Sequence, residues 1–286
     1  MRDLIVNPDS NSIMSFEWMI IDKCNQQCSY CSSKEFNKND LKSQELYKIG
    51  LYKLKTLTQD FKVDIVGGEP TLHKHLKKAV QELYELKNCT LIDICSNMRS
   101  PIELYESMNN DKLSITASFH IEYQKGFKEK CLALKHMVNV NINLYPEEKH
   151  WSDVKNIIEY CKHNDIPYGY NFLNKTLSYN PTYTSEFFEY FKEYLVESKY
   201  IVHQYTDRVE YLSESDLFRK DISYKGFKCS PMQFEIGING DIHNDCTGGT
   251  FKSFNLNNIV QEIICPLSLC QNQIKYKYKK ESNEAI

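Results

Sequence analysis

Short apolar runs alternate with longer amphipathic segments from residue 15 to about residue 200. The short runs are rich in β-branched and aromatic residues, which predicts strands at 15–22, 62–66, 90–95, 113–120, 138–145 and 168–173. The longer segments repeat apolar residues every three or four positions, as in Leu76, Val80 and Leu83. This spacing predicts helices at 43–57, from 76, from Pro101, and at 127–136, 152–163 and 185–198.

Six strand–helix units in a row indicate an α/β fold with a parallel sheet and right-handed crossovers. Six units are fewer than the eight of a closed TIM barrel, so we expect a partial (β/α)6 TIM-like barrel. A doubly wound sheet is the alternative, because no glycine-rich dinucleotide fingerprint decides between the two.

The strand–helix rhythm stops near residue 200. Residues 232–246 then predict two short strands around a turn at Asn239-Gly240, a strong hairpin signal. We therefore expect a small C-terminal cysteine-rich hairpin module beside the barrel. The predicted division is an N-terminal extension at 1–14, the barrel at 15–200, a linker and module at 201–274, and a basic flexible tail at 275–286.

Composition limits the classes of partner. The chain has 286 residues, a net charge of −3 and a pI near 6.3, so no nucleic-acid partner is indicated. No apolar stretch approaches the ~20 residues that cross a bilayer, and the first residues lack the apolar core of a signal peptide. We expect a cytoplasmic protein with no membrane partner. Its 11 cysteines then indicate metal binding or catalysis, because the cytosol keeps thiols reduced.

Three of the cysteines lie close together directly after the first predicted strand, in "CNQQCSYC" at 24–31. They fall on a loop at the carboxyl edge of the sheet, where such folds place their sites. Three thiolates can hold three corners of a cubane iron–sulfur cluster and leave the fourth iron open for another ligand. A zinc site needs a fourth ligand, and no histidine follows before His73. Three unconnected structural cysteines are a further alternative.

The same stretch resembles the C-x3-C-x2-C motif of the radical S-adenosylmethionine (SAM) enzymes, with aromatic Tyr30 before the last cysteine. The resemblance implies that Cys24, Cys28 and Cys31 bind a [4Fe–4S] cluster and that Tyr30 lies at the cofactor. In that family the open iron chelates SAM, and an electron from the cluster cleaves SAM to methionine and a 5′-deoxyadenosyl radical. The radical abstracts hydrogen from the substrate. A flavodoxin- or ferredoxin-type reductant is the implied partner.

A second motif follows the second strand, in "VDIVGGEPTLH" at 63–73. Two glycines let the backbone approach a ligand closely, and exposed carbonyl groups can accept hydrogen bonds from an ammonium group. Alone, this sequence is typical of an ordinary turn. One unit after the cysteine loop, it resembles the family's GGE motif, which implies that Gly67, Gly68, Glu69 and Pro70 contribute to SAM binding.

Alternating residues on two strands divide into a polar and an apolar face. On the fourth strand the polar residues are Ser114, Thr116, Ser118 and His120, and on the fifth they are Asn139, Asn141 and Asn143. Parallel sheets are covered by helices, so we expect the polar faces to line the barrel lumen rather than face solvent. The family resemblance implies SAM contacts near the strand ends, for which the candidates are Asn97, Ser118 and Asn141.

Three further polar residues are candidates for substrate contact or catalysis. His120 and Glu122 follow the fourth strand toward its mouth, and Glu17 lies on the first strand. A lone histidine is otherwise typical of a structural or surface position. The isolated cysteines are predicted to be small buried hydrophobic residues: Cys89, Cys95, Cys131 and Cys161.

The C-terminal cysteines are Cys229, Cys246, Cys265 and Cys270. Together with the hairpin they resemble the twitch module, a reduced relative of the SPASM domain. The C-x4-C spacing of the last pair departs from the commoner shorter one. The resemblance implies a second, auxiliary [4Fe–4S] cluster with no open iron. Zinc held by the same four thiolates is the rival interpretation.

The sequence therefore predicts a radical SAM enzyme that acts on a small polar molecule, such as a sugar, cyclitol or nucleotide-linked group. The polar lining of the lumen favours this substrate class. Modification of a ribosomally made peptide is the alternative within the same enzyme class. A non-catalytic iron–sulfur or zinc protein is the alternative of another class.

Overall fold

The computed structural model describes residues 2–3, 13–31, 40–173, 179–195, 201–204, 209–212, 227–229, 233–244, 249–251 and 263–264. Its main element is a 9-stranded sheet with the strand order β13-β12-β11-β2-β3-β4-β5-β6-β7. Six neighbouring strands of this sheet run parallel and follow the chain order. They are β2 (Met14–Ile21), β3 (Phe61–Gly67), β4 (Cys89–Ser96), β5 (Leu113–Phe119), β6 (Val138–Leu144) and β7 (Tyr168–Phe172).

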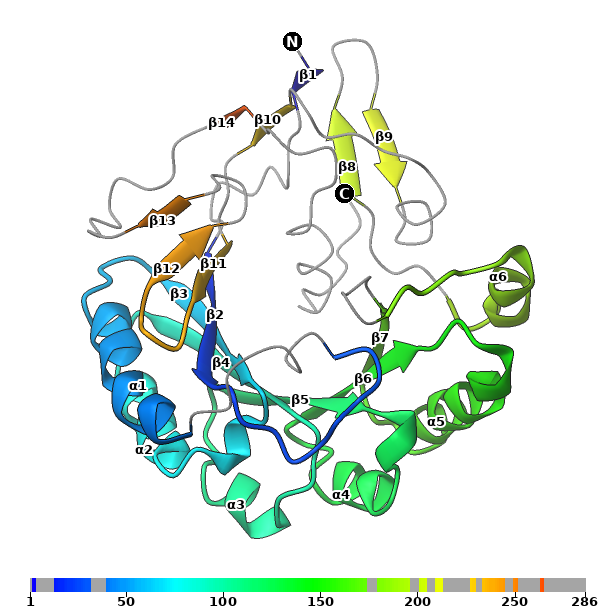
Figure 1. Ribbon diagram of the computed structural model, residues 1–286, viewed down its shortest axis with the longest axis horizontal. Helices are drawn as coiled ribbons and strands as arrows, with labels where there is room; N and C mark the ends of the chain where they lie inside the picture. The colour runs from blue at the N-terminus through cyan, green and yellow to red at the C-terminus, as the bar shows by residue number, and fades with distance from the viewer. Residues whose placement is uncertain are drawn as a thin grey trace.

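A helix follows each of these strands, and all of the helices lie on the outer side of the curved sheet (Figure 1). The helices are α1 (Asp40–Lys55), α2 (Leu76–Tyr84), α3 (Ile102–Glu106), α4 (Phe127–Ala133), α5 (Trp151–His163) and α6 (Ser185–Phe191). β2 and β7 do not pair with each other, so the barrel is open. The predicted α/β class and partial barrel are confirmed.

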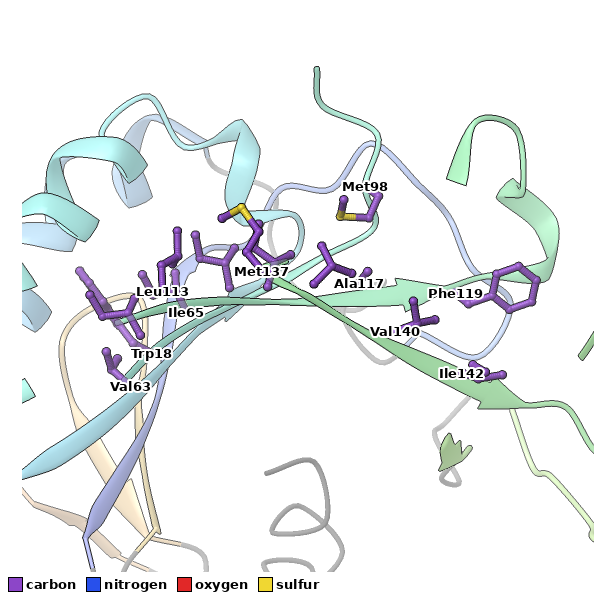
Figure 2. Packing of buried hydrophobic residues seen from close by; sticks show 14 of the residues in the cluster. Trp18, Val63, Ile65, Met98, Leu113, Ala117, Phe119, Met137, Val140 and Ile142 are labelled. Carbon is purple, nitrogen blue, oxygen red and sulfur yellow. The ribbon is translucent and has the colours of Figure 1, made fainter. Parts of the chain in front are cut away.

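The two faces of the central strands differ as their sequence alternation predicts. On β5, Ile115, Ala117 and Phe119 are fully buried, and on β6, Val140 and Ile142 are too. Figure 2 shows Ala117, Phe119, Val140 and Ile142 on the same side of the sheet, packed in the apolar core. Each such aliphatic or aromatic side chain contributes about 1.5–3 kcal/mol on burial. The polar residues between them point to the other face.

The helices bury one stripe each, but some end earlier than their pattern predicts. α5 buries Trp151, Val154, Ile157, Ile158 and Cys161, which are spaced by three or four residues. α6 begins at the predicted residue, where the Thr184 side chain accepts from the Phe187 N–H at 3.3 Å. It ends at Phe191 rather than at 198, and Phe191 O there accepts from both Tyr194 N–H and Leu195 N–H at 2.9 Å, a shared bond that is common at helix ends.

The predicted hairpin is confirmed as β11 (Gln233–Ile236) and β12 (Ile242–Asn244), which pair antiparallel. The turn requires a glycine, because Gly240 has a φ of 78°. β11 also pairs in parallel with β2, and the rings of Phe16 and Phe234 stack at 5.4 Å. β13 (Gly249–Phe251) extends this edge further. These strands therefore belong to the sheet of the barrel, although the sequence places them in the 201–274 region.

Two smaller sheets complete the described strands. β1 (Arg2–Asp3) pairs in parallel with β10 (Phe227–Cys229), which pairs antiparallel with β14 (Ile263–Ile264). β8 (Ile201–Gln204) and β9 (Val209–Leu212) form an antiparallel pair. The sequence pattern predicts none of these short pairings. Among the described helices, none is long and apolar enough to cross a membrane.

Candidate cofactor site

The cysteine loop leaves β2 at the carboxyl edge of the sheet, and the Gly67-Gly68-Glu69 segment leaves β3 beside it. The Gly68 N–H donates to Ile21 O at 2.8 Å, and the Glu69 N–H donates to Lys23 O at 2.9 Å. These bonds continue the β2–β3 pairing past the ends of both strands. The start of the loop, just before Cys24, is thereby fixed to β3.

The two glycines make this close approach possible. A Cβ atom on Gly67 would lie 1.9 Å from Ile21 O, and Gly67 has a φ of 142°. A Cβ atom on Gly68 would lie 2.3 Å from Lys23 O. The sequence predicts that these glycines admit a ligand to the backbone. The structure adds that they admit the backbone of the cysteine loop itself.

Gly68→Ala is expected to displace the cysteine loop. Because the new methyl group meets backbone atoms rather than a flexible side chain, we expect a stability loss of about 1–3 kcal/mol, typical of overpacking. Urea unfolding of the metal-free protein measures it. Gly169→Ala is the matched control, since a Cβ there meets nothing within 4 Å. Equal stability of the two variants would contradict the steric argument.

Glu69 is 1% exposed and accepts four hydrogen bonds. Its Oε1 accepts from Thr71 N at 3.2 Å, Thr71 Oγ1 at 2.6 Å and Ser96 Oγ at 2.9 Å, and its Oε2 accepts from Asn97 N at 2.8 Å. Burial raises the pKa of Glu69, and the hydrogen bonds from Asn97, Thr71 and Ser96 oppose that shift. The carboxylate therefore connects the end of β3 to the end of β4, and both of its oxygens accept hydrogen bonds from the protein.

Asn97 connects the end of β4 to the cysteine loop, as a candidate cofactor-site residue should. Its Nδ2 donates to Asn25 Oδ1 at 2.8 Å and lies 3.9 Å from Cys24 Sγ. Cys24 Sγ also accepts from the Gln26 N–H at 3.4 Å. The first cysteine therefore lies among nitrogen donors, which favour a thiolate sulfur.

The segment after Asn97 is held from outside by Lys130 of α4. The Lys130 Nζ donates to the carbonyl oxygens of Met98, Arg99 and Ser100 at 2.9, 3.1 and 2.6 Å. Met98 has a φ of 59°, an unusual conformation for a residue with a side chain. The ammonium group thus stabilises a strained turn next to the site.

Lys130→Met is expected to lower the free energy of unfolding by about 1–3 kcal/mol, because three carbonyl groups lose a charged donor while the methylene stem is kept. Thermal unfolding of the metal-free protein checks this. Lys135→Met, at an exposed position just after α4, should change stability little. An equal effect at both positions would show that the three-carbonyl contact stabilises nothing.

Two residues that follow β5, His120 and Glu122, also contact the cysteine loop. Cys28 is 5% exposed, and its Sγ lies 3.4 Å from His120 Nδ1. The same Nδ1 contacts the hydroxyl of Tyr30. Glu122 Oε1 accepts from Ser29 N at 3.3 Å and Ser29 Oγ at 3.0 Å. His120 and Glu122, candidates for substrate contact from the sequence, therefore lie against the cysteine loop.

Burial decides the charge states in this region. It lowers the pKa of His120 to about 4, against the opposing charge of Glu122, so the imidazole is neutral at pH 7. Burial also raises the pKa of Cys28 to about 12, with Glu122, Cys31 and Cys24 adding to the shift. It raises the pKa of Cys24 as well. Metal binding here therefore requires loss of thiol protons.

The pKa of Glu122 is lowered. Burial alone would raise it, but hydrogen bonds from its own backbone N–H, from Tyr145 and from Ser29 outweigh that effect. Tyr145 donates from its hydroxyl to Glu122 Oε2 at 2.9 Å. Glu122 is thus an ionised carboxylate held between β6 and the cysteine loop.

The lumen face carries the other candidates. Ser118, Asn141 and Gly169 are neighbours in register on β5, β6 and β7. Asn141 Oδ1 is buried and accepts no hydrogen bond within the described part of the chain. A Cβ on Gly169 would meet open space. This layer of the lumen offers room and an acceptor for a polar ligand.

Glu17 belongs to a row of acidic residues that the sequence analysis did not identify. It is in register with Asp64 on β3 and Glu235 on β11, and Asp64 is in register with Asp93 on β4. Each acid stands between two buried apolar residues, as in Val63, Asp64, Ile65. That alternation in the sequence could have predicted the acidic positions on β3 and β4. Glu235 joins the row only because β11 pairs with β2.

The residues of the loop fit an iron–sulfur cluster. Cys24, Cys28 and Cys31 form no disulfide, and a cubane places each thiolate on a different iron. In the described ranges, no three His, Cys, Asp or Glu side chains are arranged to share one metal ion. Gln26 is 6% exposed, and its buried Nε2 donor is unpaired among these residues. His73, the first histidine after the loop in the sequence, packs on Tyr47 of α1 at 5.0 Å, and the histidine that contacts the loop is His120, with Nδ1 3.4 Å from Cys28 Sγ.

The other cysteines fall into two groups. Cys89, Cys131 and Cys161 are buried, as predicted for small hydrophobic residues, and Cys95 is half-buried. Cys229 ends β10, where its backbone pairs with Ile263. The predicted auxiliary ligands Cys246, Cys265 and Cys270 lie outside the described residues.

Comparison with known proteins yields solved structures only. No family model matches the chain, and no curated protein matches it. Streptococcus suis SuiB bound to S-adenosylmethionine superposes with a TM-score of 0.53 at 12% identity, over 81% of this chain and 60% of SuiB. SuiB bound to the precursor peptide SuiA gives 0.53 at 13% identity, over 81% of this chain and 59% of SuiB.

The enzyme anSMEcpe with bound AdoMet and the Cp18Cys peptide superposes with a TM-score of 0.52 at 14% identity, over 88% of this chain and 77% of anSMEcpe. SuiB and anSMEcpe are radical SAM enzymes. At these identities the likeness establishes a shared fold, the partial barrel of that superfamily. The chain spans about 60% of the length of SuiB.

Proposed function

We propose that this protein is a radical SAM enzyme. One observation carries the proposal: the three-cysteine loop is fixed at the carboxyl edge of a partial barrel by the glycine segment after β3. The sequence motifs and the fold thus meet at one place. A [4Fe–4S] cluster bound there supplies the electron that cleaves SAM to methionine and a 5′-deoxyadenosyl radical. A flavodoxin- or ferredoxin-type protein is the proposed electron donor.

Each part of the site has a role in this proposal. Cys24, Cys28 and Cys31 hold the cluster. The SAM site is bordered by the backbone of Gly67, Gly68, Glu69 and the following Pro70. The side chain of Asn97 borders it too. Ser118 and Asn141 line the lumen where SAM meets the substrate. Tyr30, a residue of the loop itself, holds the loop in place because its hydroxyl contacts His120 and Asn143.

A small polar molecule is the substrate class that the lumen favours. Its described wall presents Ser, Thr and Asn side chains on β5 and β6 and an acidic row on β2, β3, β4 and β11. These groups pair with hydroxyl or amino groups rather than with apolar surface. A peptide is the second candidate, because SuiB and anSMEcpe have each been solved with a peptide bound.

The test is formation of 5′-deoxyadenosine. Anaerobically reconstituted protein, dithionite and SAM should yield it, and omission of dithionite should prevent it. Protein that carries its iron but yields no 5′-deoxyadenosine would favour the non-catalytic iron–sulfur class. The substrate class is then tested with deuterated pools of polar metabolites or of peptides, because hydrogen abstraction transfers deuterium to 5′-deoxyadenosine.

We further propose that Cys229, Cys246, Cys265 and Cys270 bind an auxiliary [4Fe–4S] cluster. Reconstituted protein is then expected to hold about eight iron atoms per chain, four per cubane. Metal analysis of anaerobically prepared protein measures this. About four irons with one zinc would instead indicate a structural zinc site, and about four irons alone would remove the auxiliary site.

A further inference from the structure

We propose that the turn after β5, His120 to Tyr123, is the anchor of the cysteine loop, and that His120 adjusts how readily the bound cluster is reduced. This inference rests on the proposed function. It assigns to His120 and Glu122 a positioning role toward the loop in place of substrate contact. We call residues 120–123 the anchor turn.

The anchor turn contacts four successive residues of the loop. Gln27 N–H donates to the Tyr123 hydroxyl at 3.1 Å, and Ser29 donates twice to Glu122 Oε1. Between and after these residues, Cys28 Sγ and the Tyr30 hydroxyl both meet His120 Nδ1. The whole span between the second and third cysteines is therefore held from one side.

The anchor turn is itself held by the end of β6. Tyr145 OH donates to Glu122 Oε2 at 2.9 Å, and accepts from Ile121 N at 3.4 Å. Asn143 Nδ2 lies 3.0 Å from both Phe119 O and the Tyr30 hydroxyl. The Tyr30 and Tyr145 rings meet edge to face at 5.4 Å. Asn143 of β6 and Tyr145, the residue after the strand, thus fix the anchor turn and the loop together.

The chemistry of His120 follows from its two partners. The Tyr30 oxygen receives a hydrogen from Asn143, which leaves its own hydrogen for His120 Nδ1. Once Cys28 ligates iron it is a thiolate, and its sulfur can then only accept hydrogen bonds. A hydrogen bond from His120 requires the other tautomer: with its hydrogen on Nδ1 rather than on Nε2, the neutral imidazole no longer accepts from Tyr30 and can donate to that sulfur at the observed 3.4 Å. A donor to a ligand sulfur stabilises the more negative, reduced state of a cluster.

The first experiment compares His120 variants in reconstituted protein, and its readouts are iron content and the reduction potential from EPR-monitored titration. His120→Ala should shift the potential to more negative values and lower iron retention several-fold on gel filtration. His120→Asn should restore most of both, because the amide of Asn lies two bonds beyond Cβ, as Nδ1 does. His120→Gln, whose amide lies one bond farther, should not.

His136→Ala is the control, because His136 is exposed on the loop before β6. It should match the wild-type protein in iron content and potential. If His120→Ala also matches the wild-type protein in both, His120 does not act on the cluster and the proposal is overturned.

The second experiment uses metal-free protein and needs no cluster. Glu122→Ala should raise amide hydrogen exchange at residues 27–30 about tenfold or more, while exchange in β5 and β6 stays slow. Glu122→Gln keeps one acceptor oxygen and should lie between the two. Unchanged protection of residues 27–30 in Glu122→Ala would overturn the anchor.

The two experiments separate this inference from the proposed function. Wild-type protein that cleaves SAM, with variants unchanged in exchange, iron and potential, would leave the function standing and remove the anchor. Wild-type protein that forms no 5′-deoxyadenosine, with exchange altered in Glu122→Ala, would remove the function and leave the anchor as a structural feature of the loop.

Discussion

Replacement of Cys24, Cys28 and Cys31 together by alanine is expected to abolish 5′-deoxyadenosine formation, a loss of at least about a thousandfold. The reason is chemical: thiolates are the ligands that hold iron in such clusters, and alanine offers none. The side-chain hydrogen bonds of Cys24 and Cys28 are made through sulfur, to neighbours in the loop, to Asn97 and to His120. We expect the barrel to fold without them.

Measurement of 5′-deoxyadenosine under reducing, anaerobic conditions, together with iron analysis, checks this expectation. The triple variant should keep the iron of the C-terminal cysteines if those form an auxiliary site. Cys161→Ala, which removes a buried thiol from the last turn of α5, is the control and should keep the activity. SAM cleavage by the triple variant would show that the loop does not hold the catalytic cluster.

The fold of the barrel follows from local pattern to a large extent. "LSITASF" on β5 and "VNVNINL" on β6 alternate polar and apolar residues, and the structure buries one face of each. When helices cover one face of a parallel sheet, such alternation allows one orientation of each strand. A shift of one residue would place the polar side chains under the helices. This is why the strands and their faces were predictable without any knowledge of tertiary contacts.

The pairing of β11 with β2 was not predictable on these grounds. The two strands come from opposite ends of the chain, and nothing in "QFEI" specifies Ser15 to Trp18 as its partner. Helix ends were misjudged for a related reason: the aromatic pattern of 185–198 continues past Phe191, although the helix ends there. Both outcomes depend on tertiary packing rather than on local propensity.

In the candidate site, too, local sequence predicts the positions of residues, whereas their contacts depend on tertiary packing. The position of His120 and Glu122 at the mouth of β5 was predictable from the strand. Their direction was not, because it depends on Tyr145, just after β6, which bonds to Glu122, and on Asn143 of β6, which bonds to Tyr30. The role of Glu69 was hidden for the same reason, since Ser96 and Asn97 reach it only once β3 and β4 are paired.

Glu69→Gln is expected to have the largest effect on stability of any single polar change at the site. Every group around the carboxylate donates to it: two backbone N–H groups and two hydroxyl groups. The amide of Gln supplies one acceptor oxygen and replaces the other by an NH2 group that cannot accept. A backbone N–H of Thr71 or Asn97 then loses its partner in a fully buried place, which costs about 1–3 kcal/mol for each unsatisfied donor.

The expected result is a lower urea midpoint for metal-free Glu69→Gln, with several-fold weaker retention of iron, because Asn97 and the glycine segment are both held through this carboxylate. Glu69→Ala should be more destabilised still, since all four donors lose their acceptor. Glu85→Gln is the matched control, because Glu85 is exposed and its side chain accepts from the Gln81 side chain on the same helix face. A Glu69→Gln protein with normal stability but impaired SAM binding would instead show that the carboxylate contacts the ligand directly.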